Sequence, residues 1–126
     1  MQDDEVVPRI NYGDIFWVAA DDSIGSISGS PHPQVVVQDD IFNHSRIPTV
    51  VVCSLSSNLK RASEPGVVLL DVGEGGLERQ SVVIASHVSS IRKSNLGARI
   101  GSLSGQRVDQ IIAALHFLHL SHFRGR

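Results

Sequence analysis

The chain has 126 residues, which suits one domain built around a single core. Hydrophobic residues make up 41% and charged residues 19%, as in an ordinary soluble protein, and no apolar run is long enough to cross a membrane. The net charge of -2 argues against the strongly basic kind of nucleic-acid binder, so any contact with nucleic acid must come from a local basic patch.

The N-terminal half predicts strands separated by one long loop. Residues 1–9 are expected to form a short acidic tail, which lacks the apolar segment of a secretory signal. Residues 12–18, YGDIFWV, predict the first strand because they are rich in aromatic and β-branched types. Residues 19–33 are rich in Ser, Gly and Pro and predict a loop, and a loop of this length is usually functional. The continuous apolar runs at 34–38 and 49–55 predict strands that are covered on both faces.

The C-terminal half predicts further strands and then one helix. Residues 67–70 and 81–86 predict two strands around a Gly-rich turn, and residues 87–92 a third. Residues 103–123 predict the helix, with Ser104 as its N-cap. Its apolar stripe is expected to comprise Val108, Ile111, Ile112, Leu115 and Leu118. Five or six short strands followed by one helix predict a mainly β fold, a small barrel with a C-terminal helix, in one domain.

Several residue types that can carry chemistry have simpler interpretations. Cys53 ends a VVVC run, and we interpret it as a buried strand thiol, whose solitary state fits the reducing cytoplasm. Three helix histidines are spaced by three, but they cannot all share one metal site, so no metal is predicted. These histidines are His116, His119 and His122. The pair Asp39 and Asp40 is expected to bond backbone N–H groups and shape a turn.

Two features leave structural and functional interpretations open. The polar cluster that ends the 49–55 strand either caps the strand or holds a phosphate; it comprises Ser54, Ser56, Ser57 and Asn58. His32 lies between two prolines that restrict its backbone, so it is either a surface loop residue or a fixed acid or base. The candidate basic patches are the pairs Lys60–Arg61 and Arg92–Lys93, together with Arg99.

The order of several segments resembles the MazF/PemK/Kid family of bacterial type II toxin endoribonucleases. The similar segments are GDIFWV, the stretch from Gly25 to Pro33, VVVQDDIFN, RIPTVVVCSLSSNLKR, and QSVVIASHVSSIRKSNL followed by IGSLSGQRVDQIIAAL. The resemblance spans roughly residues 13–118. It implies an SH3-like barrel with a C-terminal helix, acting as a cytoplasmic homodimer that contacts no membrane.

The resemblance also implies an activity and partners. Single-stranded RNA would be cleaved without metal or cofactor to 2′,3′-cyclic phosphate and 5′-OH ends, which would inhibit translation and growth. A cognate MazE-like antitoxin would silence the toxin and would be its only route to operator DNA. The 19–33 loop would gate the active site.

The resemblance places the family's catalytic Arg and Thr on His32 and Ser56 of this chain. It implies His32 as acid or base and Ser56 as a hydroxyl donor to the scissile phosphate. The implied RNA-binding or supporting residues are Ser57, Asn58, Lys60, Arg61, Gln80 and His87. Ile27, where some members carry an acid, and Gln80, where an Asp is common, also depart from the family pattern. These departures leave two alternatives: a paralogue that binds antitoxin or nucleic acid without cleaving, and a barrel adaptor with no nucleic-acid role.

Overall fold

The structure, a computed structural model, describes residues 9–19 and 30–124, with side chains up to residue 119. Its strands are β1 (Asp14–Val18), β2 (His32–Val36), β3 (Thr49–Ser56), β4 (Val67–Leu70), β5 (Ser81–Arg92) and β6 (Leu96–Ser102). Its helices are α1 (Asp40–Asn43) and α2 (Gly105–Arg124), with 3-10 turns η2 (Leu59–Arg61), η3 (Glu74–Gly76) and η4 (Lys93–Asn95). Within this part of the chain, neither helix combines the length and apolarity needed to cross a bilayer.

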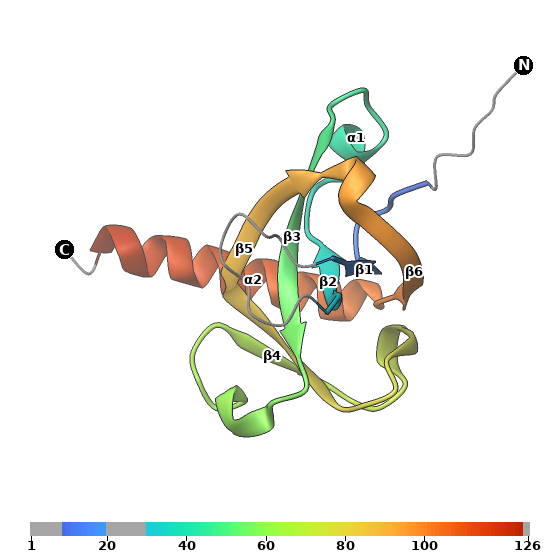
Figure 1. The fold of residues 1–126 in the computed structure, drawn as a ribbon. Helices are drawn as coiled ribbons and strands as arrows, with labels where there is room; N and C mark the ends of the chain where they lie inside the picture. Colours follow the sequence, from blue (N-terminus) through green and yellow to red (C-terminus); the bar gives the residue numbers. More distant parts are fainter. Residues whose placement is uncertain (1–8, 20–29, 125–126) are drawn as a thin grey trace, which may run out of the picture.

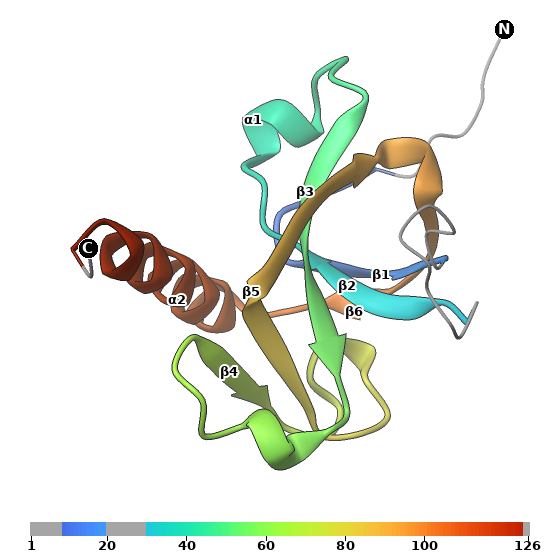
Figure 2. The same cartoon turned by 60° about the vertical axis from the view of Figure 1, so that its left-hand side comes forward.

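The strands form one antiparallel sheet in the order β4-β5-β3-β2-β1-β6. The sheet curls round strongly, and α2 packs outside it against β5 and β4 (Figures 1 and 2). The mainly β fold with a C-terminal helix is therefore confirmed. The edge strands β4 and β6 do not pair with each other, so the expected barrel is not closed by strand pairing.

The central part of the sheet is buried on both faces, as the continuous apolar runs at 34–38 and 49–55 predict. Neighbouring residues of one strand belong to separate clusters, because successive strand side chains point to opposite faces. Ile15 and Cys53 lie in the cluster that α2 covers, together with Val108 of that helix. Phe16 and Val52 lie in the second cluster, on the other face.

The first strand pairs with the last through a buried carboxylate as well as through backbone bonds. Asp14 is 2% exposed and accepts a short hydrogen bond from the Ser102 hydroxyl and another from the Asn11 N–H at 3.0 Å. The Arg99 Nε lies 3.4 Å from Asp14 Oδ1, so a cation partly balances the buried charge. This contact joins residues that are 88 positions apart in the sequence.

The gap beside β6 is filled by the η3 turn, where two backbones touch without side chains between them. A Cβ atom on Gly76 would lie 2.5 Å from the Ile100 carbonyl oxygen, and one on Gly101 would overlap the Gly75 carbonyl. Gly75 and Gly76 also have positive φ angles of 61° and 79°, which glycine adopts without strain. The η3 turn thus packs directly against the edge strand β6.

The same turn is tied to the beginning of α2. Arg107 donates two hydrogen bonds to the Glu74 carboxylate, both of 2.8 Å, and this pairing lowers the pKa of Glu74. The predicted N-cap is confirmed, because the Ser104 hydroxyl accepts the Arg107 N–H at 3.2 Å. The helix start, the turn and the edge strand are therefore fixed together.

Several predicted elements need correction. The second strand begins at His32, so His32 and Pro33 belong to a strand rather than to the 19–33 loop. The predicted strands 81–86 and 87–92 are one strand, β5, with a three-residue register shift opposite β3. Residues 20–29 of the expected loop lie outside the described residues.

The other differences concern the C-terminal third and the turn after β2. The β6 strand was not predicted, because its sequence LGARIGS contains few strand formers. The turn after β2 contains the short helix α1. On α2, Val108 and Ile111 are buried as expected, but Ile112 is 38% exposed, and Ala114 packs against the core instead.

We expect Gly101→Ala to lower the free energy of unfolding by about 1–3 kcal/mol, because its methyl group would overlap backbone atoms that cannot rotate away. Urea unfolding of the purified variant measures this change. Gly105→Ala is the matched control, since nothing lies within 4 Å of its added methyl group, and it should leave stability unchanged or slightly raised. Equal stabilities of the two variants would contradict the close contact between η3 and β6.

Candidate functional site

One cavity of about 530 Å³ lies at the C-terminal end of β3, and we refer to it as the β3-end pocket. Five strands (β1, β2, β3, β5 and β6) and the segment between β4 and β5 supply its walls. The lining residues are Trp17, His32, Pro33, Leu55, Ser56, Ser57, Gly76, Leu77, Glu78, Arg79, Ser81 and Ile100. Both residues on which the catalytic interpretation rests, His32 and Ser56, therefore face the same cavity.

Strand register explains why His32 and Ser56 meet. Gln34 of β2 pairs with Ser54 of β3, and the same antiparallel register carried two residues further sets His32 opposite Ser56. Directly opposed residues on an antiparallel pair have Cβ atoms about 5 Å apart. The side chain of His32 is exposed and that of Ser56 half-buried, so a ligand in the pocket can reach both.

The Ser56 hydroxyl serves the turn as well as the pocket. Its oxygen accepts the Asn58 N–H at 3.0 Å, and the Asn58 side chain in turn accepts the Lys60 N–H at 3.1 Å. The strand-capping interpretation of this cluster is thereby confirmed. Because the Ser56 oxygen acts only as an acceptor in this turn, its own O–H can rotate and donate to a ligand.

Arg79 is a pocket residue that the sequence analysis missed. It is exposed, and its guanidinium makes no ion pair with any residue that the structure describes. The Ser81 hydroxyl donates to the Arg79 carbonyl at 3.0 Å and so fixes the backbone just before β5. In the sequence, Arg79 lies in the charged segment LERQS, a pattern that is equally typical of a solvent-exposed turn.

Two further lining residues add an acid and an aromatic surface. Glu78 brings a carboxylate to the wall that Arg79 also forms. Trp17 of β1 lines the pocket and is 44% exposed. Exposed aromatic side chains in a groove that also carries a cation are typical of surfaces that stack nucleic-acid bases.

The remaining sequence candidates lie apart from this group. Ser57 lines the pocket, whereas Asn58, Lys60 and Arg61 belong to the turn that follows β3. The Arg61 Nε donates to Glu64 at 3.1 Å. Two more candidates do not line the pocket: Gln80, which is half-buried, and His87, which is exposed at the β5 register shift. Ile27 lies outside the described residues.

The simpler interpretations of Asp39, Asp40 and Cys53 are confirmed. Asp39 accepts the Ile41 N–H at 2.8 Å and caps α1, while Asp40 accepts the Tyr12 N–H at 2.6 Å and the Asn43 amide at 3.0 Å. Burial alone would raise the pKa of Asp40, but these hydrogen bonds outweigh it and leave that pKa lowered. Cys53 is fully buried in β3, and desolvation raises its pKa to about 12.

The described side chains form no group of three or more His, Cys, Asp or Glu residues that could hold a metal ion. His116 and His119 are exposed on α2, and the side chain of His122 lies outside the described part of the chain. The chemistry that the pocket offers therefore comes from an imidazole, hydroxyls, one carboxylate and one guanidinium.

Comparison with known proteins gives one consistent result. A family model described as PemK-like, MazF-like toxin of type II toxin–antitoxin system matches residues 11–119. The chain is 29% identical over 106 residues to "Endoribonuclease EndoA" of Bacillus subtilis, covering 84% of this chain and 90% of that protein. It is 29% identical over 102 residues to "Endoribonuclease MazF6" of Mycobacterium tuberculosis, covering 81% and 90%.

Solved structures share the fold. MazF (Form-I) from Deinococcus radiodurans aligns with a TM-score of 0.70 at 21% identity, covering 90% of this chain and 97% of that one. A mycobacterial endoribonuclease in complex with its cognate antitoxin aligns with a TM-score of 0.69 at 18% identity, covering 86% and 92%. At these identities the likeness supports the architecture alone.

We expect the Cys53 thiol of the folded protein to resist iodoacetamide at about pH 8–9 and to react once denaturant is added, because only the thiolate attacks. The folded pKa of about 12 lies above the ordinary value of 9.0. The stability that comes from keeping this thiol neutral is thus complete below about pH 9 and is lost as the pH rises toward 12. Cys53→Ala is the control, and its stability should fall less over that range. Fast labelling of the folded chain would contradict the buried, neutral thiol.

Proposed function

Because the chain belongs to the family of PemK-like, MazF-like toxins of type II toxin–antitoxin systems, we propose that it cleaves single-stranded RNA at the β3-end pocket. The matched curated relatives are named endoribonucleases. The observation that carries the proposal is the meeting of His32, Ser56 and Arg79 around one cavity. These three side chains supply a proton-transfer group, a hydrogen-bond donor and a permanent cation.

The proposed reaction is transesterification by the RNA itself. The ribose 2′-OH attacks the adjacent phosphorus, its proton passes to a base, and the bond from phosphorus to the 5′-oxygen breaks. The leaving oxygen takes a proton from an acid, which gives a 2′,3′-cyclic phosphate and a 5′-OH end. The step balances with protein groups alone, so the proposal includes no metal and no cofactor.

Each requirement of this step has a candidate in the pocket. His32 takes one of the two proton-transfer roles, since imidazole can both accept and donate near neutral pH. Glu78 is the pocket's carboxylate and is the candidate for the other role. The Ser56 O–H donates to a non-bridging phosphate oxygen, where negative charge grows as the pentacoordinate state forms.

Arg79 is relevant to whether a site that lacks the family's catalytic Arg can still cleave RNA. The family's catalytic Arg position falls on His32, which removes a permanent cation from β2. A guanidinium from the segment before β5 lines the same pocket and offers a forked donor set that suits phosphate. This relocated charge favours a rebuilt active site over the non-cleaving paralogue.

The proposal extends to partners. Two of the solved neighbours are described as an endoribonuclease in complex with its cognate antitoxin and as a MazE–MazF structure from Deinococcus radiodurans. We propose that a MazE-like antitoxin silences this chain by competing with RNA for the β3-end pocket. In this proposal the active form is a cytoplasmic homodimer that reaches operator DNA only through the antitoxin, and cleavage inhibits translation and growth.

The test is cleavage of a long unpaired RNA by the purified chain in EDTA between about pH 6 and 8, the range in which histidine titrates. We expect cuts with 5′-OH ends, whose rate changes with pH and which His32→Ala abolishes. The matched control is His116→Ala, which removes an exposed histidine of α2 outside the pocket and should retain normal rates. Intact RNA with the folded wild-type chain at every pH would refute cleavage and favour the paralogue that binds without cutting.

We expect Arg79→Ala to lower kcat about 100-fold, the usual cost of losing one donor to a developing oxyanion. Arg79→Lys should recover part of this loss, because it restores the charge without the forked geometry. Single-turnover cleavage measures the effect on the chemical step. Arg61→Ala is the comparison, since Arg61 is paired with Glu64 outside the pocket. A larger loss with Arg61→Ala would assign the phosphate contact to the turn after β3.

A further inference from the structure

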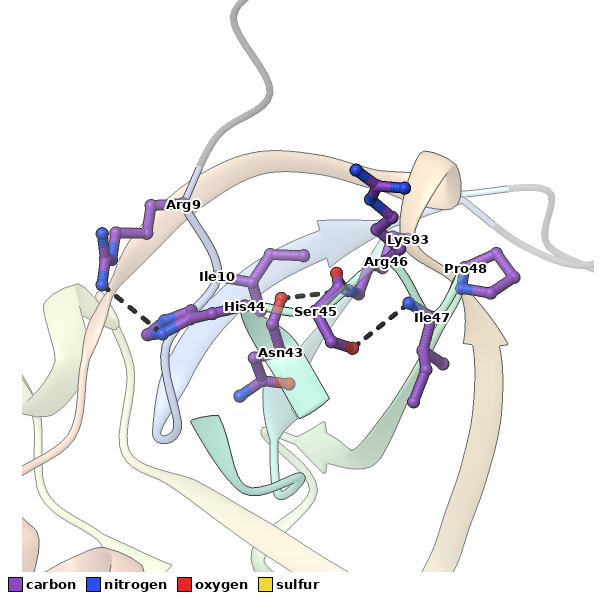
Figure 3. Close-up of a pocket in the computed structure, with 9 residues that line it drawn as sticks. All are labelled: Arg9, Ile10, Asn43, His44, Ser45, Arg46, Ile47, Pro48 and Lys93. Atoms are coloured by element: carbon purple, nitrogen blue, oxygen red, sulfur yellow. Dashed lines mark hydrogen bonds between the residues drawn. The ribbon is translucent and has the colours of Figure 1, made fainter. Parts of the chain in front are cut away.

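A second cavity, of about 470 Å³, lies at the opposite end of β3 from the β3-end pocket. Its walls come from the segment before β1, from the loop between α1 and β3, and from Lys93 just after β5 (Figure 3). We refer to it as the Arg46 pocket. Figures 1 and 2 place α1 at this end of β3 and β4 near the other end.

Positive charge is concentrated around this cavity. Arg9, Arg46 and Lys93 are permanent cations, and His44 stands among them. No Asp or Glu is among the described residues that line it, although the whole chain carries a net charge of -2. The nearest acidic contact is Asp40, whose Oδ1 lies 3.9 Å from His44 and is already bonded by Tyr12 and Asn43.

Lys93 stabilises the wall of the cavity, and its ammonium group has no hydrogen-bond donor left for a ligand. Its ammonium group donates to the carbonyl oxygens of Phe42 at 3.3 Å, Asn43 at 3.0 Å and Ser45 at 3.0 Å. Its backbone N–H also bonds the Pro48 carbonyl at 2.8 Å. The three donors of Lys93 are therefore used to fix the loop, while its charge still adds to the positive potential of the pocket.

The two arginines are held differently, on opposite sides of the cavity (Figure 3). The Arg9 Nη2 lies 3.4 Å from His44 Nδ1, and His44 Nε2 lies 2.9 Å from Asn11 Oδ1. This chain of contacts fits an imidazole that donates from Nε2 and accepts at Nδ1, and it leaves most Arg9 donors free. Arg46 is exposed and makes no ion pair with the described residues, so its guanidinium is available to a ligand.

We propose that the Arg46 pocket is a second phosphate site, which binds the backbone of the RNA strand away from the cut. The inference rests on the proposed function and adds a contact to it. The eight residues of β3 span seven steps of ~3.3 Å, so the two pockets lie about 23 Å apart. Only an RNA long enough to reach both pockets can occupy them at the same time.

Charge and donor geometry favour a phosphate as the occupant. Affinity for a nucleic-acid strand accumulates with each phosphate that a cation neutralises. The β3-end pocket offers one permanent cation, Arg79, which alone holds a flexible polyanion weakly. A site with two arginine forks and the fixed charge of Lys93 supplies the additional neutralisation on the same small domain.

The test is binding of a long, fully 2′-O-methyl RNA, which has no 2′-OH and so cannot be cut. Its affinity is measured at several salt concentrations for the wild-type chain, Arg46→Ala and the control Arg92→Ala. Arg92 is the residue just before Lys93. The sequence made it a candidate for a basic patch, but it is exposed and lines neither pocket. Arg46→Ala should lower the slope of log K against log salt by about 0.7 and weaken binding about five-fold at ~0.1 M salt. Arg92→Ala should change neither, and a short RNA that fills only the β3-end pocket should bind all three proteins equally.

Because the probe cannot be cleaved, this result is independent of the proposed reaction. If the wild-type chain cuts no RNA but Arg46→Ala still weakens binding and lowers the salt slope, the phosphate site stands and only the proposed reaction is refuted. Equal slopes for Arg46→Ala and Arg92→Ala would overturn the site. A second result would also overturn it: Arg46→Ala binds RNA normally but no longer binds poly-glutamate or inorganic phosphate. That result would assign the pocket to an acidic protein segment or to a free anion.

Discussion

The contact on which both the sheet and the pocket depend is the direct approach of two backbones between the η3 turn and β6. The sheet has two unpaired edges, and glycines at positions 76 and 101 allow the turn to lie against one of them, while a side chain at position 75 would meet Ile15 and Leu103 of the core. The turn then leads straight into Leu77–Arg79, which forms one wall of the β3-end pocket. The Glu74–Arg107 pair anchors the other side of the turn to α2. One glycine-dependent contact thus completes the core and positions the cation of the site.

Much of the fold was predictable because local patterns and tertiary needs agree. The run at 67–70 is bounded by turn residues and became β4 without change. Ser104 caps the helix as its type and position indicated. β6 was missed for a physical reason. Its glycines are there because another backbone lies close to them, whereas strand propensity reflects how side chains pack on a pleated surface. The β5 strand was divided in two because its register shift depends on β3, which no local pattern reveals.

The site was predictable only in part. His32 and Ser56 came from the family resemblance, and the β2–β3 register explains why residues so distant in sequence face each other. Arg79 was missed because a charged residue in a turn carries no local sign of the cavity that it lines. His87 also came from the resemblance, but it lies at the register shift of β5 and does not line the pocket. Pairing between strands, which the sequence does not show directly, decides where His32, Ser56 and His87 lie.

The pairing of β1 with β6 has a consequence for how the protein is made. Asp14 and Ser102 meet across 88 positions, and the β3-end pocket draws on residues from Trp17 to Ile100. Such distant contacts can form only once both segments have been made, and closing long loops slows folding. During synthesis, a ribosome must therefore release about four-fifths of the chain before the pocket can assemble. A chain that ends before β6 lacks both Ile100 of the pocket and the Ser102 partner of Asp14, so it cannot form the complete pocket.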